Sequence, residues 1–319
     1  MTVFRHILLV DAGSTKTEWR LIGRKGETKL EIVTPGINAL ITSDEQIAEI
    51  FDKVKIELCD SLTSEVVISK LLKAPLMPPA KVDEIHFYGA GCATDASKQR
   101  IKDALQLRFP TSDIGVESDL VAAARAICGK TAGVACILGT GSNSCLYDGK
   151  LIIANTPPMG YVLGDEGSGT AIGRRLISDA FKQLMPEQTA TRFMDIAGIS
   201  LEEIVNNVYS RTGNINTSPN TYIASFTKIA SQMIDDEYIR KLIFEEFKLF
   251  ISRNVSQYRR IKSLKIGFVG SIAVNFSDIL KEAVESFGYK MGKIVATPMD
   301  GLARYHSRTS FGSEQQIKE

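Results

Sequence analysis

Short apolar or alternating segments open the chain, a pattern typical of β-strands that bury one face. In the second segment Trp19 and Leu21 fall on the same face, and Pro35-Gly36 ends the series. We therefore expect an antiparallel meander of three strands. Glycine-containing turns separate the segments, which cover residues 6–11, 17–22 and 28–34.

A helical period follows. Its apolar positions lie three or four residues apart, at Ile47, Ile50, Phe51, Val54 and Leu58. This spacing predicts an amphipathic helix that begins near Ser43, with a separate helix at 64–72. Further strands are expected at 82–88, 114–117, 133–138, 143–147, 151–154, 264–269 and 290–295. Further helices are expected at 97–107, 119–127, from the 164–169 glycine segment to about 184, between 187 and 262, at 275–286 and from about 300.

One arrangement occurs twice in the chain. A strand, the turn Asp11-Ala-Gly-Ser-Thr15 and a second strand open the first half. A strand, the turn Leu138-Gly-Thr-Gly-Ser142 and a second strand open the second half. Each meander leads into helices. This repetition predicts a duplicated α/β fold of two lobes with a cleft between them.

Composition limits the class of protein. The chain has 319 residues, of which 44% are hydrophobic and 24% charged, a balance that is ordinary for a globular protein of about two domains. A net charge of +1 provides no general attraction for nucleic acid or an anionic membrane, and no apolar run approaches the ~18 residues of a membrane span. The first residues lack the apolar region of a signal peptide, so we expect a cytoplasmic protein. Its five scattered cysteines are expected to be reduced.

Glycine turns after apolar strands are candidates for phosphate binding, because side chains do not cover their backbone N–H groups. The first turn contains Gly13, and Ser14, Thr15 and Lys16 add donors that suit a terminal phosphate. Asp11, just before this turn, is placed to hold Mg²⁺ directly or through water. A plain hairpin turn is the alternative, and the sequence leaves both open.

Two further glycine turns have the same character. The second follows a fully apolar strand and offers small polar donors. The third lies between a strand and a helix, where open α/β sheets bind nucleotides. The residues are Gly139, Thr140, Gly141 and Ser142 in the second turn, and Gly270 and Ser271 in the third.

Carboxylates at expected helix starts have two interpretations. By frequency Asp119 is an N-cap, with Ser118 beside it. Its functional interpretation is a general base that takes a proton from an attacking hydroxyl and is kept ionised by the helix N-terminus. Asp165 and Glu166 lie between glycines at another helix start, and are either caps or ligands of sugar hydroxyls. Asn38 is a loop amide that carries little information alone.

The chain resembles the BadF/BadG/BcrA/BcrD-type ATPase family, and within it the N-acetylglucosamine kinase branch, which has the fold shared by sugar kinases, Hsp70 and actin. The resemblance covers most of the chain in the order of elements. Its most specific feature is Gly-Thr-Gly-Ser-Asn followed later by Gly-Asp-Glu-Gly. The resemblance is sharpest in residues 11–16, 117–119, 138–143 and 160–167.

This resemblance implies a duplicated actin-like ATPase fold with ribonuclease H-like lobes. The expected lobes are residues 1–116 with about 300–319, and residues 117–299. It also implies ATP and Mg²⁺ as cofactors, with the first two glycine turns around the phosphates and Gly270-Ser271 near the adenosine. It is compatible with a homodimer, and the expected partner is a small-molecule amino sugar.

Site residues follow from the same resemblance. Asp119 falls on the family's catalytic aspartate, and Asn38, Gly160 and Asp165 fall where the family contacts the sugar. The sugar kinases often have a tryptophan just before the glycine that corresponds to Gly160, where this chain has Met159. The identity of the sugar therefore stays open.

Three hypotheses follow from the resemblance. The first is an ATP-dependent kinase that phosphorylates an amino sugar at O6, with N-acetylglucosamine first and glucosamine or N-acetylmuramic acid as alternatives. The second is the ATPase that activates 2-hydroxyacyl-CoA dehydratases, which holds an iron–sulfur cluster through cysteine motifs that this chain lacks. The third is a non-catalytic sugar sensor. Such regulators usually carry a helix-turn-helix, for which the residues before the first strand leave no room.

Overall fold

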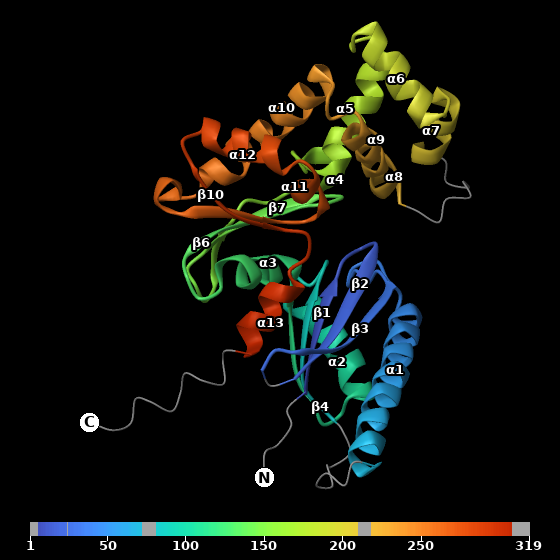
Figure 1. Ribbon diagram of the computed structural model, residues 1–319, viewed down its shortest axis with the longest axis vertical. Coiled ribbons are helices and arrows are strands. Elements are labelled where there is room, and N and C mark those ends of the chain that lie inside the picture. Colours follow the sequence, from blue (N-terminus) through green and yellow to red (C-terminus); the bar gives the residue numbers. More distant parts are fainter. Residues whose placement is uncertain (1–5, 24, 72–80, 210–217, 308–319) are drawn as a thin grey trace. The chain divides into compact units, whose positions relative to one another are not determined.

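The computed structural model describes residues 6–23, 25–71, 81–209 and 218–307, without the side chains of residues 63–71. The chain forms two compact units, each built on its own five-stranded sheet (Figure 1). Unit 1 contains the residues up to Ala126 and those from Pro298 onward, and unit 2 contains Ile127–Thr297.

The sheet of unit 1 has the strand order β3-β2-β1-β4-β5. The first three strands of the chain pair antiparallel, and β4 and β5 extend the sheet in parallel on the other side of β1. The strands are β1 (His6–Ala12), β2 (Lys16–Ile22), β3 (Thr28–Pro35), β4 (Val82–Gly89) and β5 (Asp113–Ser118). The helices are α1 (Asp44–Leu71), α2 (Asp95–Arg108), α3 (Asp119–Cys128) and α13 (Met299–Ser307).

Alternation along the strands gives this sheet two different faces. Trp19 of β2 lies in the larger core, where its ring centroid is 5.7 Å from that of Phe51 of α1 and 6.4 Å from that of Phe87 of β4. Ile7 and Leu9 of β1 contribute to a smaller core with α3 and α13. The two sets of helices therefore cover opposite faces of the sheet, as the ribbon of unit 1 shows (Figure 1).

A polar chain fastens α13 to the second face. The Tyr88 hydroxyl accepts a hydrogen bond of 2.8 Å from Arg125 Nη1, and lies 2.8 Å from His306 Nε2. Because the arginine can only donate, the Tyr88 proton remains available to a neutral His306, whose Nε2 can accept it. Burial lowers the pKa of His306 to about 2, with the charges of His86 and Arg125 adding to the effect. The rings of His86 and His306 stack with centroids 3.7 Å apart.

The sheet of unit 2 repeats this topology, with the order β10-β9-β6-β7-β8. Its first three strands form the antiparallel meander, and the last two extend it in parallel. The strands are β6 (Gly133–Leu138), β7 (Ser142–Tyr147), β8 (Ile152–Asn155), β9 (Lys265–Val269) and β10 (Lys290–Val295). The repeated topology confirms the predicted duplication of an α/β fold.

Helices supply most of the remaining residues of unit 2, and its core includes Phe247, Phe250, Phe268 and Phe276. The helices are α4 (Gly160–Leu163), α5 (Gly169–Phe181), α6 (Glu187–Ala197), α7 (Leu201–Tyr209), α8 (Pro219–Ser225), α9 (Thr227–Gln232), α10 (Glu237–Arg253), α11 (Ser271–Asn275) and α12 (Ser277–Ser286), with 3₁₀ turns at Val255–Gln257 and Ile261–Ser263. In the described part of the chain, no helix combines the length and the hydropathy that crossing a bilayer requires.

Two helix boundaries differ from the sequence-based expectation. Residues 44–71 form one helix rather than two, because no glycine or proline interrupts them. The helix expected at 275–286 is divided between α11 and α12 at Phe276. The backbone of this residue leaves the helical region (φ −120°, ψ 33°) while its side chain is buried.

Phe51→Ala is expected to destabilise unit 1 by about 3–5 kcal/mol, because it leaves a cavity between the helix and the sheet. Trp19 is the single tryptophan and lies in the same core, so its fluorescence during urea unfolding reports on this unit. Ile56→Ala on the same helix is the control, since Ile56 is 62% exposed. Equal losses of unfolding free energy in the two variants would contradict the assignment of Phe51 to the core.

His306→Gln is expected to remove an acid-dependent loss of stability. His306 stays neutral in the folded state because its pKa is lowered to about 2, from an ordinary value of 6.5. The unfolded chain therefore binds more protons below about pH 6.5, so the histidine costs stability as the pH falls, by up to ~1.4 kcal/mol per unit. Between pH 7 and 4 the unfolding free energy of the variant should rise relative to that of the wild type. If the difference in unfolding free energy between the two proteins did not change with pH, the buried imidazole of His306 would not be neutral.

Candidate active site

The first glycine turn joins β1 to β2 and packs against the backbone that follows β3. The Gly13 N–H donates to the Lys16 carbonyl at 3.0 Å, and the Gly36 N–H donates to the Thr15 carbonyl at 3.2 Å. A Cβ at position 36 would stand 2.3 Å from the Ser14 carbonyl oxygen, so only glycine permits this approach. The side chains of residues 14–16 are exposed, and their donors can reach a ligand.

Asn38 lies beside this turn. Its Nδ2 donates to Ser14 Oγ at 3.2 Å, and its Oδ1 accepts the Leu40 N–H at 3.0 Å. A backbone bridge joins it to Ala90, after β4. Gly91 has φ +80° and passes so closely that a Cβ there would lie 2.4 Å from Asn38 Oδ1. The segment after β4 therefore lies beside the first glycine turn.

Asp11 lies near the end of β1, opposite Glu18 of β2 in the antiparallel register. Burial raises the pKa of Asp11 to about 7, repulsion from Glu18 and then Asp119 adds to this, and Lys16 opposes it. The Lys16 Nζ lies 2.5 Å from Glu18 Oε1. Three carboxylates and one ammonium group thus interact in this part of unit 1. Glu18 was not among the predicted residues, although the register of the meander could have indicated it.

Asp119 is the first residue of α3 and directly follows β5. The N-cap interaction comes from its neighbour, since Ser118 Oγ accepts the Val121 N–H at 3.4 Å. One oxygen of Asp119 accepts the Leu120 N–H at 2.8 Å. Burial raises the pKa of Asp119, and these backbone hydrogen bonds only partly oppose it. Burial therefore outweighs the hydrogen bonds at the helix start in setting the direction of this pKa, and the carboxylate is a stronger proton acceptor than an exposed aspartate.

The oxygen donors around Asp11 fit a hard divalent cation. Among the described residues, no group of three or more His, Cys, Asp or Glu side chains is arranged to hold a metal ion. Mg²⁺ is usually held by one or two carboxylates together with waters and substrate phosphates. The charged form of Asp11 is disfavoured by burial and by two neighbouring carboxylates, and a divalent cation would relieve that repulsion.

The second glycine turn joins β6 to β7 and rests on the start of α5. The Gly139 N–H donates to the Gly141 carbonyl at 3.0 Å, and the Gly169 N–H donates to the Gly139 carbonyl at 2.8 Å. Thr170 uses both its N–H and its hydroxyl to donate to the Thr140 carbonyl, at 3.1 and 2.7 Å. A Cβ built on Gly139 would meet no described atom within 4 Å beyond its chain neighbours. This side of the turn is therefore open to a ligand.

The third turn lies directly against the second. Gly270 follows β9 with φ +124°, and α11 begins at the exposed Ser271. A Cβ at position 270 would stand 2.2 Å from the Leu138 carbonyl oxygen and 3.3 Å from the Gly139 nitrogen. The two turns predicted in the second half of the chain are thus adjacent within unit 2.

Left-handed backbone conformations concentrate between β8 and α5. Met159 (φ 64°), Gly160 (φ 71°) and Asp165 (φ 58°) all have positive φ, and such strain in non-glycine residues is common at functional sites. Gly160 is exposed at the start of α4. Asp165 is buried, and its carboxylate accepts the Ser142 N–H at 3.3 Å. Burial raises the pKa of Asp165, and the hydrogen bond from Ser142 opposes the rise. This aspartate therefore braces the second glycine turn.

Glu166 has a different set of partners from its neighbour. Arg253 Nη1 donates to its Oε1 at 2.9 Å, and Asn254 Nδ2 donates to its Oε2 at 3.3 Å, both from the end of α10. Burial raises the pKa of Glu166, but these hydrogen bonds outweigh burial and leave it below its ordinary value. Both oxygens of Glu166 are thus occupied in fastening the strained segment to α10.

The structure brings most of the predicted residues into two groups, one in each unit. Gly160 lies on the exposed start of α4, and Glu166 is bound to the end of α10. Unit 1 groups Asp11, Gly13, Ser14, Thr15, Lys16, Asn38 and Asp119, and unit 2 groups Gly139, Thr140, Gly141, Ser142, Asp165, Gly270 and Ser271.

Gly270→Ala is expected to destabilise unit 2 and to weaken nucleotide binding, because its Cβ would push the third turn away from Leu138. Gly288→Ala is the matched control. Gly288 also has a positive φ (71°), but its Cβ would meet nothing within 4 Å. Each substitution destabilises the protein by about 1 kcal/mol because alanine disfavours a positive φ. In a nucleotide titration, the affinity of Gly270→Ala should be several-fold lower than that of Gly288→Ala. Equal affinities would contradict the role of the third turn.

Solved structures of sugar kinases are similar to this chain. It is 35% identical to a candidate N-acetylglucosamine kinase from Porphyromonas gingivalis, with a TM-score of 0.81 over 95% of this chain and 99% of that chain. It is 18% identical to a candidate N-acetylglucosamine kinase from Chromobacterium violaceum, with a TM-score of 0.65 over 94% of this chain and 98% of that chain.

A third similarity, at 14% identity and a TM-score of 0.50, is to a ROK-family glucokinase from Streptomyces griseus, over 95% of this chain and 97% of that chain. It shows the fold alone, as does the match at 18% identity. No protein-family model matches the sequence, and no curated protein matches it significantly. On its 35% identity over nearly the full length of both chains, the protein belongs to the N-acetylglucosamine kinase-type family of sugar kinases, with the actin-like ATPase fold.

Proposed function

We propose that this protein is an ATP-dependent kinase that transfers phosphate to O6 of an amino sugar, with N-acetylglucosamine as the first candidate. We place it in the BadF/BadG-type ATPase family through the sequence segments described above. Two observations support the proposal. The chain belongs to a sugar kinase family, and each unit has glycine turns of the kind that can bind phosphate.

The observation that carries the proposal is the state of Asp119. Its neighbour Ser118 supplies the N-cap interaction, so Asp119 keeps an oxygen that no described residue binds. Burial raises its pKa, which makes the carboxylate a stronger proton acceptor. In the proposed reaction this oxygen takes the proton of the attacking sugar hydroxyl as that hydroxyl bonds to the γ-phosphorus, and ADP leaves with the electron pair.

Phosphoryl transfer depends mainly on placing and neutralising charge. The exposed donors of Ser14, Thr15 and Lys16 would bind the terminal phosphates from unit 1. The turns at 139–142 and 270–271 would bind the rest of the nucleotide in unit 2. A Mg²⁺ ion held by Asp11, when bound, would supply positive charge to the phosphate oxygens.

Four residues are proposed to form the sugar site, three by contact and one through its neighbours. Asn38 stands beside the first turn, and Gly160 and Asp165 belong to the strained segment of unit 2. Glu166 would act through that segment, since Arg253 and Asn254 already occupy its carboxylate. Met159 is 59% exposed at the place where related kinases often have tryptophan, so the contact to the sugar ring in this chain is made differently.

Release of ADP from Mg-ATP tests the proposal. The panel contains hexoses, hexosamines, N-acetylhexosamines and N-acetylmuramic acid, with a reaction lacking sugar as the control. Release of ADP only in the presence of one sugar would identify both the reaction and the substrate. Steady ADP without sugar would favour the dehydratase-activating ATPase instead. Absence of ADP with every sugar, together with sugar binding by calorimetry, would favour a non-catalytic sensor.

Asp119→Asn is expected to lower kcat by about 10²–10⁴, because the amide cannot accept the hydroxyl proton. The KM for the sugar and its dissociation constant should change less than about threefold, since the amide is isosteric with the carboxylate. Asp113→Asn is the matched control, as Asp113 is exposed at the other end of β5. Turnover near the wild-type rate in Asp119→Asn would remove Asp119 as the base.

A further inference from the structure

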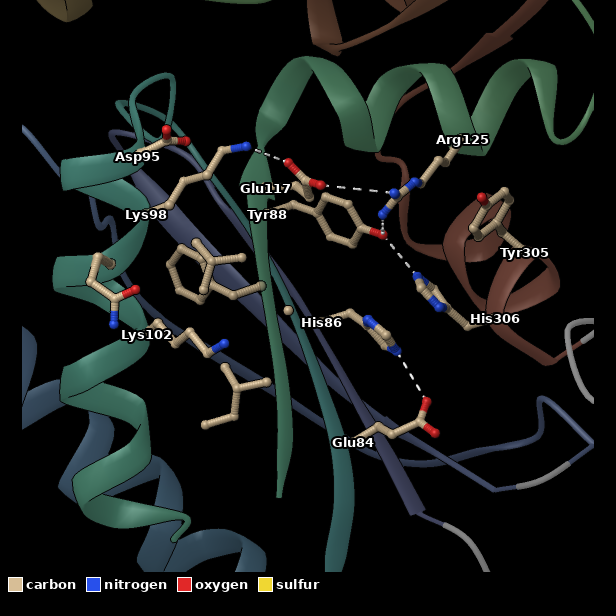
Figure 2. Close-up of a pocket in the computed structure, with 15 residues that line it drawn as sticks. Glu84, His86, Tyr88, Asp95, Lys98, Lys102, Glu117, Arg125, Tyr305 and His306 are labelled. Carbon is tan, nitrogen blue, oxygen red and sulfur yellow. Dashed lines mark hydrogen bonds and ion pairs between the residues drawn. The ribbon is translucent and has the colours of Figure 1, made fainter. Parts of the chain in front are cut away.

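A cavity of about 630 Å³ lies at the free edge of the unit 1 sheet, along β5. Figure 2 shows its walls, with α2 on one side of the strand and α3 and α13 on the other. This volume falls within the range of small-molecule sites, about 300–1,000 Å³. None of the candidate catalytic, phosphate or sugar residues lines it.

Three cationic side chains from two helices reach this cavity. Lys98 and Lys102 stand one turn apart on α2, and Arg125 comes from α3. Like charges at this spacing on a helix destabilise it slightly. Lys102 is exposed and forms no ion pair with any described residue. Its ammonium group extends toward β5 in Figure 2.

Arg125 has donors that its neighbours do not satisfy. Its side chain is 20% exposed, and its guanidinium donates a hydrogen bond of 2.8 Å to the Tyr88 hydroxyl. Its Nε is buried without a hydrogen-bond partner among the described residues. The Glu117 carboxylate stands 3.9 Å away, too far for a hydrogen bond. A guanidinium carries five donors, so an anion that approached more closely would gain several hydrogen bonds.

Among the described residues, the carboxylate of Glu117 contacts two of these cations. Glu117 Oε2 is 2.6 Å from Lys98 Nζ, and its other oxygen makes the long contact with Arg125. Of the other acids that line the cavity, Glu84 lies 3.1 Å from His86, and Asp95 lies in the first turn of α2, where the helix N-terminus stabilises it. The part of the cavity near Glu117 therefore has more positive than negative charge.

We propose that this cavity binds a phosphate monoester of a hydroxylated small molecule, with its phosphate held by Lys98, Lys102 and Arg125. A carboxylate ligand would only replace the charge that Glu117 already supplies. A phosphate monoester carries about −1.5 to −2 charges and three strong acceptor oxygens, so it can occupy all three cations. The rest of the lining mixes apolar side chains with polar ones, and among the polar ones Gln99, Tyr305 and Glu84 offer partners for hydroxyl groups. This assignment does not depend on the proposed kinase reaction.

Binding to the full-length protein tests the proposal, by calorimetry with glucose 6-phosphate, AMP and inorganic phosphate as probes and glucose as the uncharged control. One of the two esters should bind, which separates a sugar phosphate from a nucleotide as the source. The double variant Lys98→Met and Lys102→Met should weaken that binding at least tenfold. Lys55→Met, an exposed lysine of α1, is the matched control and should leave it unchanged.

A variant of the candidate active site separates the two sites of the protein. Asp11→Asn should keep the affinity for the ester, because Asp11 does not line the cavity. Equal affinity in the wild type and the double lysine variant would overturn the proposal, as would loss of binding in Asp11→Asn alone. Binding of inorganic phosphate without either ester would overturn the assignment to a monoester.

Discussion

The close approach of a second backbone segment to a glycine turn is the constraint on which the candidate residues of each unit depend. In unit 1 the chain at Gly36 runs against the carbonyl of Ser14, and in unit 2 the chain at Gly270 runs against the carbonyl of Leu138. Neither position can accept a Cβ without moving the turn beside it. Once the turns are fixed in this way, side chains such as Asn38 and Asp165 can bind them, while residues 14–16 stay exposed and Gly139 stays open on one side.

Electrostatic strain accompanies this arrangement in unit 1. The register of β1 and β2 places Asp11 opposite Glu18, and both influence each other in a poorly solvated environment that also feels Asp119. Removing charge from water without full compensation costs stability. Packing alone therefore does not explain this group of carboxylates. A cationic ligand would compensate it, and for this reason the strain is informative about function.

Much of the fold could be predicted from the sequence, because it depends on local patterns. The alternation in residues 6–34, the turn residues and the repeated strand–glycine turn–strand order indicate the meanders and the duplication. Non-local contacts account for what was missed. The partners of Glu166 are 87 and 88 residues away along the chain, and the pKa of Asp119 depends on burial that no helix-start pattern contains. The position of Glu18 opposite Asp11 could have been predicted from the strand register alone, which the predicted hairpin already implied.

The duplication also shows how one fold can be kept while its two copies diverge in chemistry. In unit 1 the last strand of the sheet leads into a helix whose first residue is Asp119, with an oxygen left unbound. The corresponding strand of unit 2, β10, leads through Pro298 into a helix that begins with Met299, which is 1% exposed and packs in an apolar core. The helix after the last strand thus begins with a carboxylate in the first case and, where the chain returns to unit 1, with an apolar residue in the second. Because an ionisable group at a buried junction costs stability, its retention in the first copy alone is the pattern expected if selection for chemistry, rather than for packing, acts at Asp119.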